Sequence, residues 1–211
     1  MTDRTDSLPP AVILSGGRSS RMGEAKALLA FGPARLVDHV AARIAPQVSD
    51  LFINANDPSI RLTGIDAFAD GISGFRGPLA GIHAALAHIR DARPGASHVF
   101  VLPVDCPFFP RDIVRRLSDA LTAPSDISLA ASGGRMHPVL GLWPVSLMDP
   151  LAAWLADPPT LKVRAFLDGR PVRITDYPMV ETALGPLDPF FNVNIPADLD
   201  RARRLLDEVK P

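Results

Sequence analysis

Residues 14–26 combine a glycine-rich backbone with several cations, the two features that a phosphate-binding loop needs. The segment reads LSGGRSSRMGEAK. The adjacent Gly16 and Gly17 let the backbone approach a ligand closely and present consecutive N–H donors. Arg18, Arg21 and Lys26 add three cations within nine residues. The segment suits a polyphosphate chain, although a Gly/Ser turn with solvated arginines is the alternative for a bare pair of glycines.

The two best-known phosphate-binding patterns do not describe this segment. A P-loop has a glycine, four other residues and then Gly-Lys-Ser/Thr. Here five residues separate Gly17 from Gly23, and Lys26 comes three positions later. The dinucleotide pattern G-x-G-x-x-G is absent as well. The segment is therefore neither a P-loop nor a dinucleotide-binding turn.

Asp105 is the candidate metal ligand. It follows the apolar run Val99–Leu102, which ends at Pro103. A carboxylate beside such a run is unfavourable unless it serves a partner. Mg²⁺ commonly takes one or two protein carboxylates together with phosphate oxygens and water, so Asp105 suits a metal–phosphate complex. The alternative is a carboxylate that accepts backbone hydrogen bonds in a loop.

Four further polar residues stand where strands or loops end. Asn54 and Asp70 each follow a short apolar run, where they could contact a nucleoside or simply form turns. Asn192 and Asn194 flank Val193, and this alternation predicts that both side chains lie on one face of a strand. The alternative for this pair is that the side chains satisfy loop backbone.

The elements that must position these residues alternate between strands and helices. Strands are predicted at 11–14, 51–53, 67–69, 99–102, 127–131, 139–143 and 172–174, and helices at 34–48, 78–92, 110–121, 146–156, 161–167 and 196–209. Pro78 and Pro196 support two of the helix starts, because proline is favoured at the first helical position. This alternation predicts an α/β fold with a mostly parallel central sheet flanked by helices. The second half alternates less cleanly, so some antiparallel strand content is expected there.

The polar loops should converge on one edge of that sheet. In open α/β sheets, ligands bind at the carboxyl ends of the strands. Segments 15–26, 54–57, 70–81 and 103–107 all follow predicted strands. We therefore expect a single site built from several loops, in one domain over 11–211 preceded by a loose leader at 1–10.

Composition limits the function classes. The formal net charge of −1 over 211 residues provides no general attraction to nucleic acid or anionic lipid. The polar N-terminus does not resemble a secretory signal, and no apolar run approaches the roughly 20 residues of a membrane span. Cys106 is the single cysteine, so no intrachain disulfide can form, which is compatible with a reducing compartment. A cytoplasmic protein is expected.

The string Leu14–Lys26 resembles the L-x-G-G-x-x-x-R-M-G-x-x-K signature of the molybdenum cofactor guanylyltransferases, a branch of the molybdopterin nucleotidyltransferases. Ser15 and Ala25 depart from it, where alanine and aspartate are usual. Further segments are similar along nearly the whole chain: 54–56, 77–81, 103–107, 137–138 and 191–196.

The resemblance implies a Rossmann-like nucleotidyltransferase that transfers GMP from GTP to the phosphate of molybdopterin, releases pyrophosphate and forms a guanine dinucleotide cofactor. It implies Mg²⁺ on Asp105, and Arg21, Lys26 and Asp105 as the catalytic groups. The nucleotide-binding set that it implies is Leu14, Ser15, Gly16, Gly17, Lys26, Asn54, Asp70, Gly77, Pro78 and Asp105. Asn192 and Asn194 would contact the pterin-bearing substrate, and proteins that deliver the cofactor or accept the product would be partners.

Three alternatives stay open at this point. A related cytidylyltransferase would use CTP, but its first loop typically has Ala-Gly where this chain has Gly16-Gly17. A sugar-phosphate nucleotidyltransferase is a second alternative, although such chains are often longer and lack the late pair of asparagines. A nucleotide-binding regulatory module without turnover is the third, and Ala25 beside Lys26 is the feature that favours it.

Overall fold

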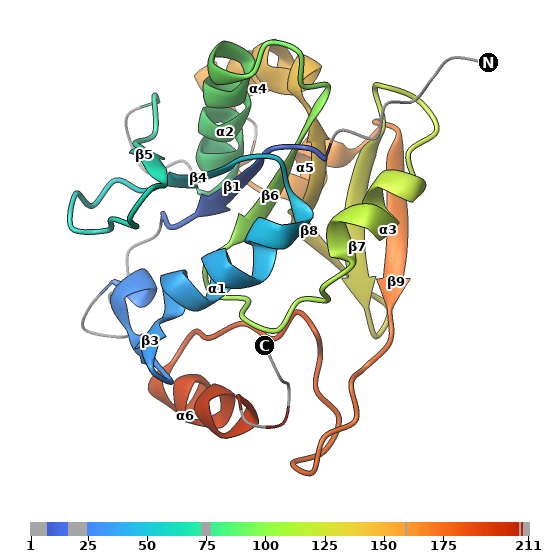
Figure 1. Cartoon of the computed structure of the whole chain (residues 1–211). Helices are drawn as coiled ribbons and strands as arrows, with labels where there is room; N and C mark the ends of the chain where they lie inside the picture. The colour runs from blue at the N-terminus through green and yellow to red at the C-terminus, as the bar shows by residue number, and fades with distance from the viewer. Residues whose placement is uncertain (1–7, 17–24, 73–76, 159, 207, 209–211) are drawn as a thin grey trace.

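The computed structural model describes residues 8–16, 25–72, 77–158, 160–206 and 208. Its centre is a seven-stranded sheet with the strand order β5-β4-β1-β6-β8-β7-β9 (Figure 1). The strands are β1 Ala11–Leu14, β4 Leu51–Asn54, β5 Asp66–Phe68, β6 His98–Pro103, β7 Ile127–Ser132, β8 Arg135–Pro144 and β9 Val172–Tyr177. The α-helices are α1 Leu36–Ile44, α2 Pro78–Ala92, α3 Ile113–Asp119, α4 Met148–Ala156, α5 Val163–Leu167 and α6 Pro196–Leu205.

The sheet is parallel except for one strand. β1 pairs in parallel with β4 and β6, β4 with β5, and β7 with β9, whereas β8 is antiparallel to both β6 and β7. The predicted α/β class, with a mostly parallel sheet and antiparallel content in the second half, is confirmed. The carboxyl ends of β6, β7 and β9 point toward the lower side of Figure 1, where α6 and the segment that precedes it lie.

Two apolar layers cover the two faces of the sheet. On one face, Ile13, Ile53 and Phe100 pack with side chains of α1 and α3. On the other face, Val12 and Val101 pack with α2, α4 and α5. Strands covered on both faces need apolar side chains at every position, which is why β1 and most of β6 read as unbroken apolar runs.

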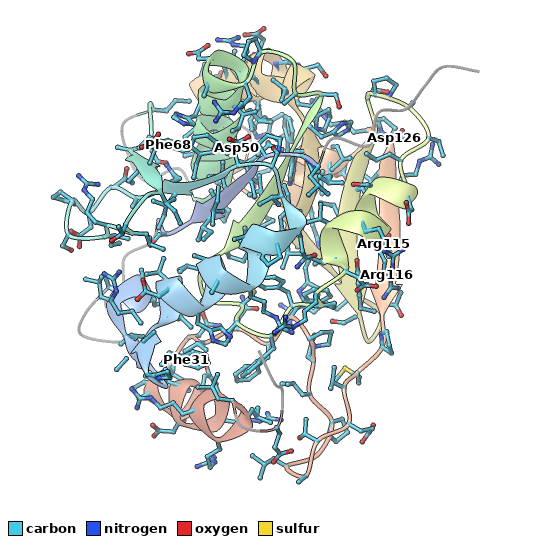
Figure 2. The ribbon with its side chains drawn as sticks, in the orientation of Figure 1. Phe31, Asp50, Phe68, Arg115, Arg116 and Asp126 are labelled. Carbon is cyan, nitrogen blue, oxygen red and sulfur yellow. The ribbon has the colours of Figure 1, made fainter. Side chains whose placement is uncertain are left out.

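A third, smaller cluster connects α6 to the chain just after the first loop. This part contains the 3₁₀ helix Lys26–Leu28, followed by the two-residue strands β2 Ala30–Phe31 and β3 Ala34–Arg35, which form a hairpin. Phe31 is buried and lies beside α6 in Figure 2. The sequence prediction missed this hairpin. Its consequence is that α6, from the end of the chain, packs next to the element that begins at Lys26.

The hairpin β7–β8 contains a wide bulge. Leu129 pairs with Gly141 and Ala131 pairs with Met136, so four residues of β8, 137–140, face Ala130 alone. A Cβ atom on Gly141 would lie 2.2 Å from the carbonyl oxygen of Ser128. The close approach of the two strands here therefore requires glycine.

The described end of the predicted leader is hydrogen-bonded to the sheet and the segment before β4. Residues 1–7 of the predicted leader lie outside the described residues, and the carbonyl groups of Pro9 and Pro10 accept hydrogen bonds from Ser49 and Phe100. None of the helices in the described part of the chain has the length and hydropathy that a bilayer-spanning helix needs.

Candidate active site

The centre of the site is an ion pair between Lys26 and Asp105. The loop after β6 is tied to the end of β1, because the N–H of Val104 donates to the carbonyl of Leu14 at 3.0 Å. This places Asp105 beside the 3₁₀ helix that starts at Lys26. Lys26 Nζ lies 2.9 Å from Asp105 Oδ2, and the two side chains are 22% and 17% exposed. The pair is thus largely shielded from water while still open to a ligand.

Both predicted asparagines join this pair. Lys26 Nζ donates to Asn194 Oδ1 at 2.7 Å, and Asn192 Nδ2 donates to Asp105 Oδ1 at 3.5 Å. Between them, the N–H of buried Val193 donates to the carbonyl of Asp105 at 2.9 Å. The prediction that Asn192 and Asn194 share one face of a strand was wrong, since these residues belong to no strand. Their side chains nevertheless reach the same cluster, because the backbone is anchored to the Asp105 loop.

The buried thiol of Cys106 contacts Asn192 and orients its amide group. Its Sγ donates to Asn192 Oδ1 at 3.2 Å, which leaves the amide nitrogen of Asn192 facing Asp105. Burial, as the largest cause, raises the pKa of the Cys106 thiol well above its ordinary value, so the thiol stays protonated and remains a donor. The sequence reasoning missed this contact.

The end of β1 presents the described part of the predicted phosphate loop. The N–H of Ser15 donates to the carbonyl of Asn54 at 2.8 Å, while Ser15 Oγ is buried with no hydrogen-bond partner among the described residues. A Cβ on Gly16 would meet no described atom within 4 Å. Gly17 and Arg21 lie outside the described residues.

Asn54 is a buried residue at the end of β4. It is 1% exposed, and its Nδ2 lies 3.5 Å from the carbonyl of Phe68. Its Oδ1 lies 3.3 Å from the point where a Cβ on Gly81 would stand. The side chain therefore fits tightly under the first turns of α2, and its contact with a nucleoside stays a prediction.

Asp70 is held by Asn56, a residue that the sequence reasoning did not single out as a functional group. Asn56 Nδ2 donates to Asp70 Oδ2 at 2.8 Å, and the N–H of Asp70 donates to Asn56 Oδ1 at 2.9 Å. Asp70 Oδ1 is buried and has no hydrogen-bond partner among the described residues. A buried acceptor of this kind needs a donor, and the contact of Asp70 with a base stays a prediction.

Gly77 and Pro78 form the start of α2 at the same edge of the sheet. Gly77 has φ of +66° and ψ of −161°, a region open essentially only to glycine. A Cβ there would meet no described atom within 4 Å, so the requirement is conformational. The first N–H groups of a helix have no partner within the helix and suit an anion.

The comparisons with known proteins show the family of the chain. The model of the MobA-like NTP transferase domain matches residues 11–174. A molybdenum cofactor guanylyltransferase of Rhizobium meliloti is 46% identical over 94% of this chain and 92% of its own, and that of Sinorhizobium fredii is 44% identical over 95% and 93%. The chain belongs to the MobA-like NTP transferase family.

The fold is shared with a solved structure. The crystal structure of molybdopterin-guanine dinucleotide biosynthesis protein A from Archaeoglobus fulgidus matches 94% of this chain and 99% of its own with a TM-score of 0.69 and 22% identity. The predicted nucleotidyltransferase class and the resemblance to guanylyltransferases are confirmed by the family and the curated relatives. The cytidylyltransferase alternative is not favoured by those relatives.

The carboxylate of the ion pair suits a metal ion that binds together with a phosphate substrate. Among the described residues, no group of three or more His, Cys, Asp or Glu side chains could hold a metal ion by itself. Asp105 is a single carboxylate, and Mg²⁺ commonly takes one or two protein carboxylates together with phosphate oxygens and water. The predicted Mg²⁺ ligand therefore stays Asp105 alone.

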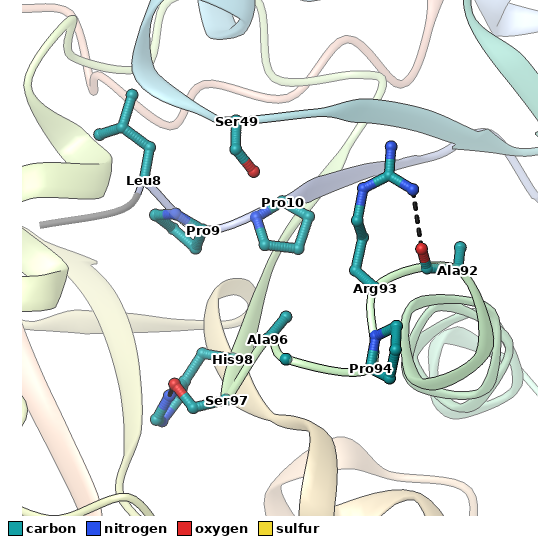
Figure 3. Close-up of a pocket in the computed structure, with 11 residues that line it drawn as sticks. Leu8, Pro9, Pro10, Ser49, Ala92, Arg93, Pro94, Ala96, Ser97 and His98 are labelled. Carbon is teal, nitrogen blue, oxygen red and sulfur yellow. Dashed lines mark hydrogen bonds between the residues drawn. The ribbon is translucent and has the colours of Figure 1, made fainter. Parts of the chain in front are cut away.

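A surface hollow of about 480 Å³ lies away from the cluster (Figure 3). It is lined by the residues before β1 and by the turn between α2 and β6, at the amino ends of these strands: Pro9, Pro10, Ala92, Pro94 and Ser97 are among them. The cluster around Asp105 stands at the carboxyl ends of the same strands, so this hollow is not part of it.

Proposed function

We propose that this chain transfers GMP from GTP to the phosphate of molybdopterin, releasing pyrophosphate and forming the guanine dinucleotide cofactor. The observation that carries the proposal is the convergence of Lys26, Asp105, Asn192 and Asn194 in one hydrogen-bonded cluster at the carboxyl edge of the sheet. The 46% identity to a curated guanylyltransferase over nearly the full length supports the choice of reaction.

The chemistry needs positioning more than it needs a base. The attacking group is a phosphate monoester with a second pKa of about 6, which is largely dianionic at neutral pH. Its oxygen forms a bond to the α-phosphorus of GTP, and the bond from that phosphorus to the bridging oxygen breaks, so that pyrophosphate leaves with the electron pair. The difficulty is to bring two anions together in line, and fixed cations reduce that repulsion.

Lys26 supplies a cation at this point, the family signature assigns Arg21 to the phosphates, and Asp105 would hold the Mg²⁺. When bound, the metal would supply charge neutralisation at the phosphate oxygens. Lys26 already contacts both Asp105 and Asn194, so its ammonium group stands between the metal ligand and the side chain assigned to the pterin substrate. This position lets one cation serve both anionic groups.

The nucleotide would lie along the ends of β1, β4 and β5. In this proposal the backbone N–H of Gly16 and the first turn of α2, behind Gly77 and Pro78, would face phosphate. Asp70 would accept hydrogen bonds from two adjacent N–H groups of guanine, which cytosine does not offer. Its fixed orientation on Asn56 supports this assignment.

Molybdopterin is the second substrate in this proposal, and proteins that deliver it or receive the product are partners. A net charge of −1 supports no role for nucleic acid. The single cysteine of the chain supports a cytoplasmic location. Fractionation of the native host into cytoplasm, membrane and periplasm would test the location directly.

Pyrophosphate release from purified protein tests the reaction. With Mg²⁺ and molybdopterin, GTP should give turnover and CTP should give at least tenfold less. Asp105→Asn should lower turnover by at least 10²-fold, while Asp157→Asn, at an exposed aspartate outside the cluster, should not. A protein that binds GTP but releases no pyrophosphate would instead be a regulatory module, and stronger turnover with CTP would overturn the guanine assignment.

A further inference from the structure

Ser132 links two segments at the carboxyl end of β7. Its hydroxyl donates to Asp188 Oδ1 at 2.7 Å and lies 2.8 Å from His137 Nε2. Because a carboxylate only accepts, the single hydroxyl proton points to Asp188, and the oxygen of Ser132 accepts from the Nε2–H of His137. Burial lowers the pKa of His137, so a neutral ring with its proton on Nε2 satisfies the chain.

The bulge in β8 is what brings His137 to this position. His137 is the first of the four residues that face Ala130 alone. Bulges re-aim side chains at sheet edges and beside active sites. Without the extra residues, the regular alternation of the strand would set the direction of this ring. The fold thus contains a local irregularity at the point where the bond to Ser132 is made.

Asp188 belongs to a segment that crosses the edge of the sheet to the Lys26–Asp105 pair. We call residues 188–194 the strap. Its first residue contacts the β7–β8 hairpin, and its later residues contact the Lys26–Asp105 pair. Asp188 Oδ1 accepts from Ser132 and from the N–H of Phe190 at 2.8 Å, and the ring of Phe190 lies 4.7 Å from that of His137. The strap ends on α6, beneath the sheet in Figure 1.

The far end of the strap carries the two asparagines. The carbonyl of Phe190 and the amide of Asn192 both contact the thiol of Cys106, and Asn194 contacts Lys26. The strap therefore has one anchor at the hairpin and another at the catalytic cluster. A shift at Asp188 would move the backbone that sets Asn192 and Asn194.

The order of the strands places the contacts among Ser132, His137 and Asp188 away from the residues assigned to the nucleotide. Residues assigned to GTP follow β1, β4 and β5, on one side of β6, whereas Ser132 and His137 lie on β7 and β8, on the other side. Asp105, which follows β6, stands between the two sides. The strap therefore faces the side from which the second substrate must approach.

We propose that Ser132, His137 and Asp188 form a positioning unit that holds the strap for binding of the phosphate-bearing acceptor, and that this unit does not act on GTP. This inference rests on the proposed function for the identity of the acceptor. In this unit Asp188 acts as a hydrogen-bond acceptor through Oδ1, because its two partners there, a hydroxyl and a backbone N–H, both donate.

Three variants and a matched control test the unit. Ser132→Ala should raise the KM for molybdopterin about tenfold, the effect of one lost hydrogen bond. Asp188→Ala, which also removes the acceptor for the N–H of Phe190, should raise it at least tenfold, and in both variants the KM for GTP should stay within about twofold. Asp188→Asn keeps the acceptor and should stay near wild type. Ser128→Ala is the control, because Ser128 lies on the same strand and its buried hydroxyl has no partner among the described residues.

Two readouts separate this proposal from the reaction itself. The double variant Ser132→Ala/Asp188→Ala should match Asp188→Ala alone, because coupled residues are not additive. In titrations, Ser132→Ala and Asp188→Ala should bind molybdopterin about tenfold or more weakly than wild type, whether or not pyrophosphate is released. Wild type that binds molybdopterin without turnover would therefore overturn only the proposed reaction. An equal rise in both KM values, Asp188→Asn as impaired as Asp188→Ala, or wild type that fails to bind molybdopterin would overturn the positioning unit.

Discussion

The contact between Lys26 and Asp105 can be measured in the protein without any substrate. The perturbation is a double-mutant cycle of Lys26→Met and Asp105→Asn, followed by urea unfolding with EDTA and no nucleotide. Each single variant leaves the opposite charge behind, only partly exposed, whereas the double variant removes both. The losses in unfolding free energy of the two single variants should therefore add up to more than the loss measured for the double variant.

The size of the coupling follows from distance and burial. Exposed ion pairs contribute about 0.2–1 kcal/mol, and breaking a fully buried pair costs about 3–5 kcal/mol. With the atoms 2.9 Å apart and the side chains 22% and 17% exposed, we expect about 1.5 kcal/mol. At about 2–4 °C per kcal/mol for a chain of this size, the coupling corresponds to about 3–6 °C in Tm.

A second ion pair provides the control for this cycle. Arg90 Nη1 and Asp149 Oδ1 are 3.5 Å apart on side chains that are 48% and 85% exposed, so the cycle Arg90→Met with Asp149→Asn should give about 0–0.5 kcal/mol. Raising the salt to about 0.5 M should abolish the control coupling and preserve most of that between Lys26 and Asp105. Additivity within about 0.3 kcal/mol at Lys26 and Asp105 would refute the geometry of the site.

Three further predictions address stability and the site. Gly141→Ala should lower stability by about 2–4 kcal/mol because its Cβ would lie 2.2 Å from a carbonyl oxygen; a change in Tm below about 2 °C would contradict this. Hydrogen bonds from Thr122 and Arg173 hold the pKa of Asp126 well below its usual value, so that contribution to stability is present above about pH 4 and is lost as the pH falls below it; Tm measured against pH should be flatter in Asp126→Asn. Cys106→Ala should lower kcat/KM about threefold to tenfold, and Cys106→Ser, which keeps a donor, should recover part of it; equal losses in steady-state assays would remove the orienting role.

Strands with apolar side chains on both faces were the most predictable part of the fold. Ala11–Leu14 was predicted with its observed bounds, and the helix expected at 78–92 begins at Pro78 as observed. The start of β8 was placed at 139 instead of Arg135, because the bulge interrupts the alternation that marks a strand. The hairpin β2–β3 was missed, since strands of two residues carry no measurable period.

The members of the site were predictable, but their mutual contacts were not. Strand ends and a family resemblance selected Lys26, Asp105, Asn192 and Asn194, and the structure brings all four together. The sequence reasoning assigned Lys26 to phosphate and Asp105 to metal, so their direct contact was not expected. The role of Cys106 depends on a partner 86 positions away, and no local pattern reports such a distance.

In the proposed reaction, the position of β6 would keep the sites of the two anionic substrates apart. β6 is the last parallel strand before the direction reverses at β8. Loops after β1, β4 and β5 meet on one side of it, and the hairpin β7–β8 with the strap meets on the other. Asp105, at its carboxyl end, is bonded to both sides, through Lys26 and through Asn192. In the proposed role of Asp105 as metal ligand, its place just after the shared central strand would tie the metal to both halves of the site, whereas a ligand that belonged to either half alone could move with that half.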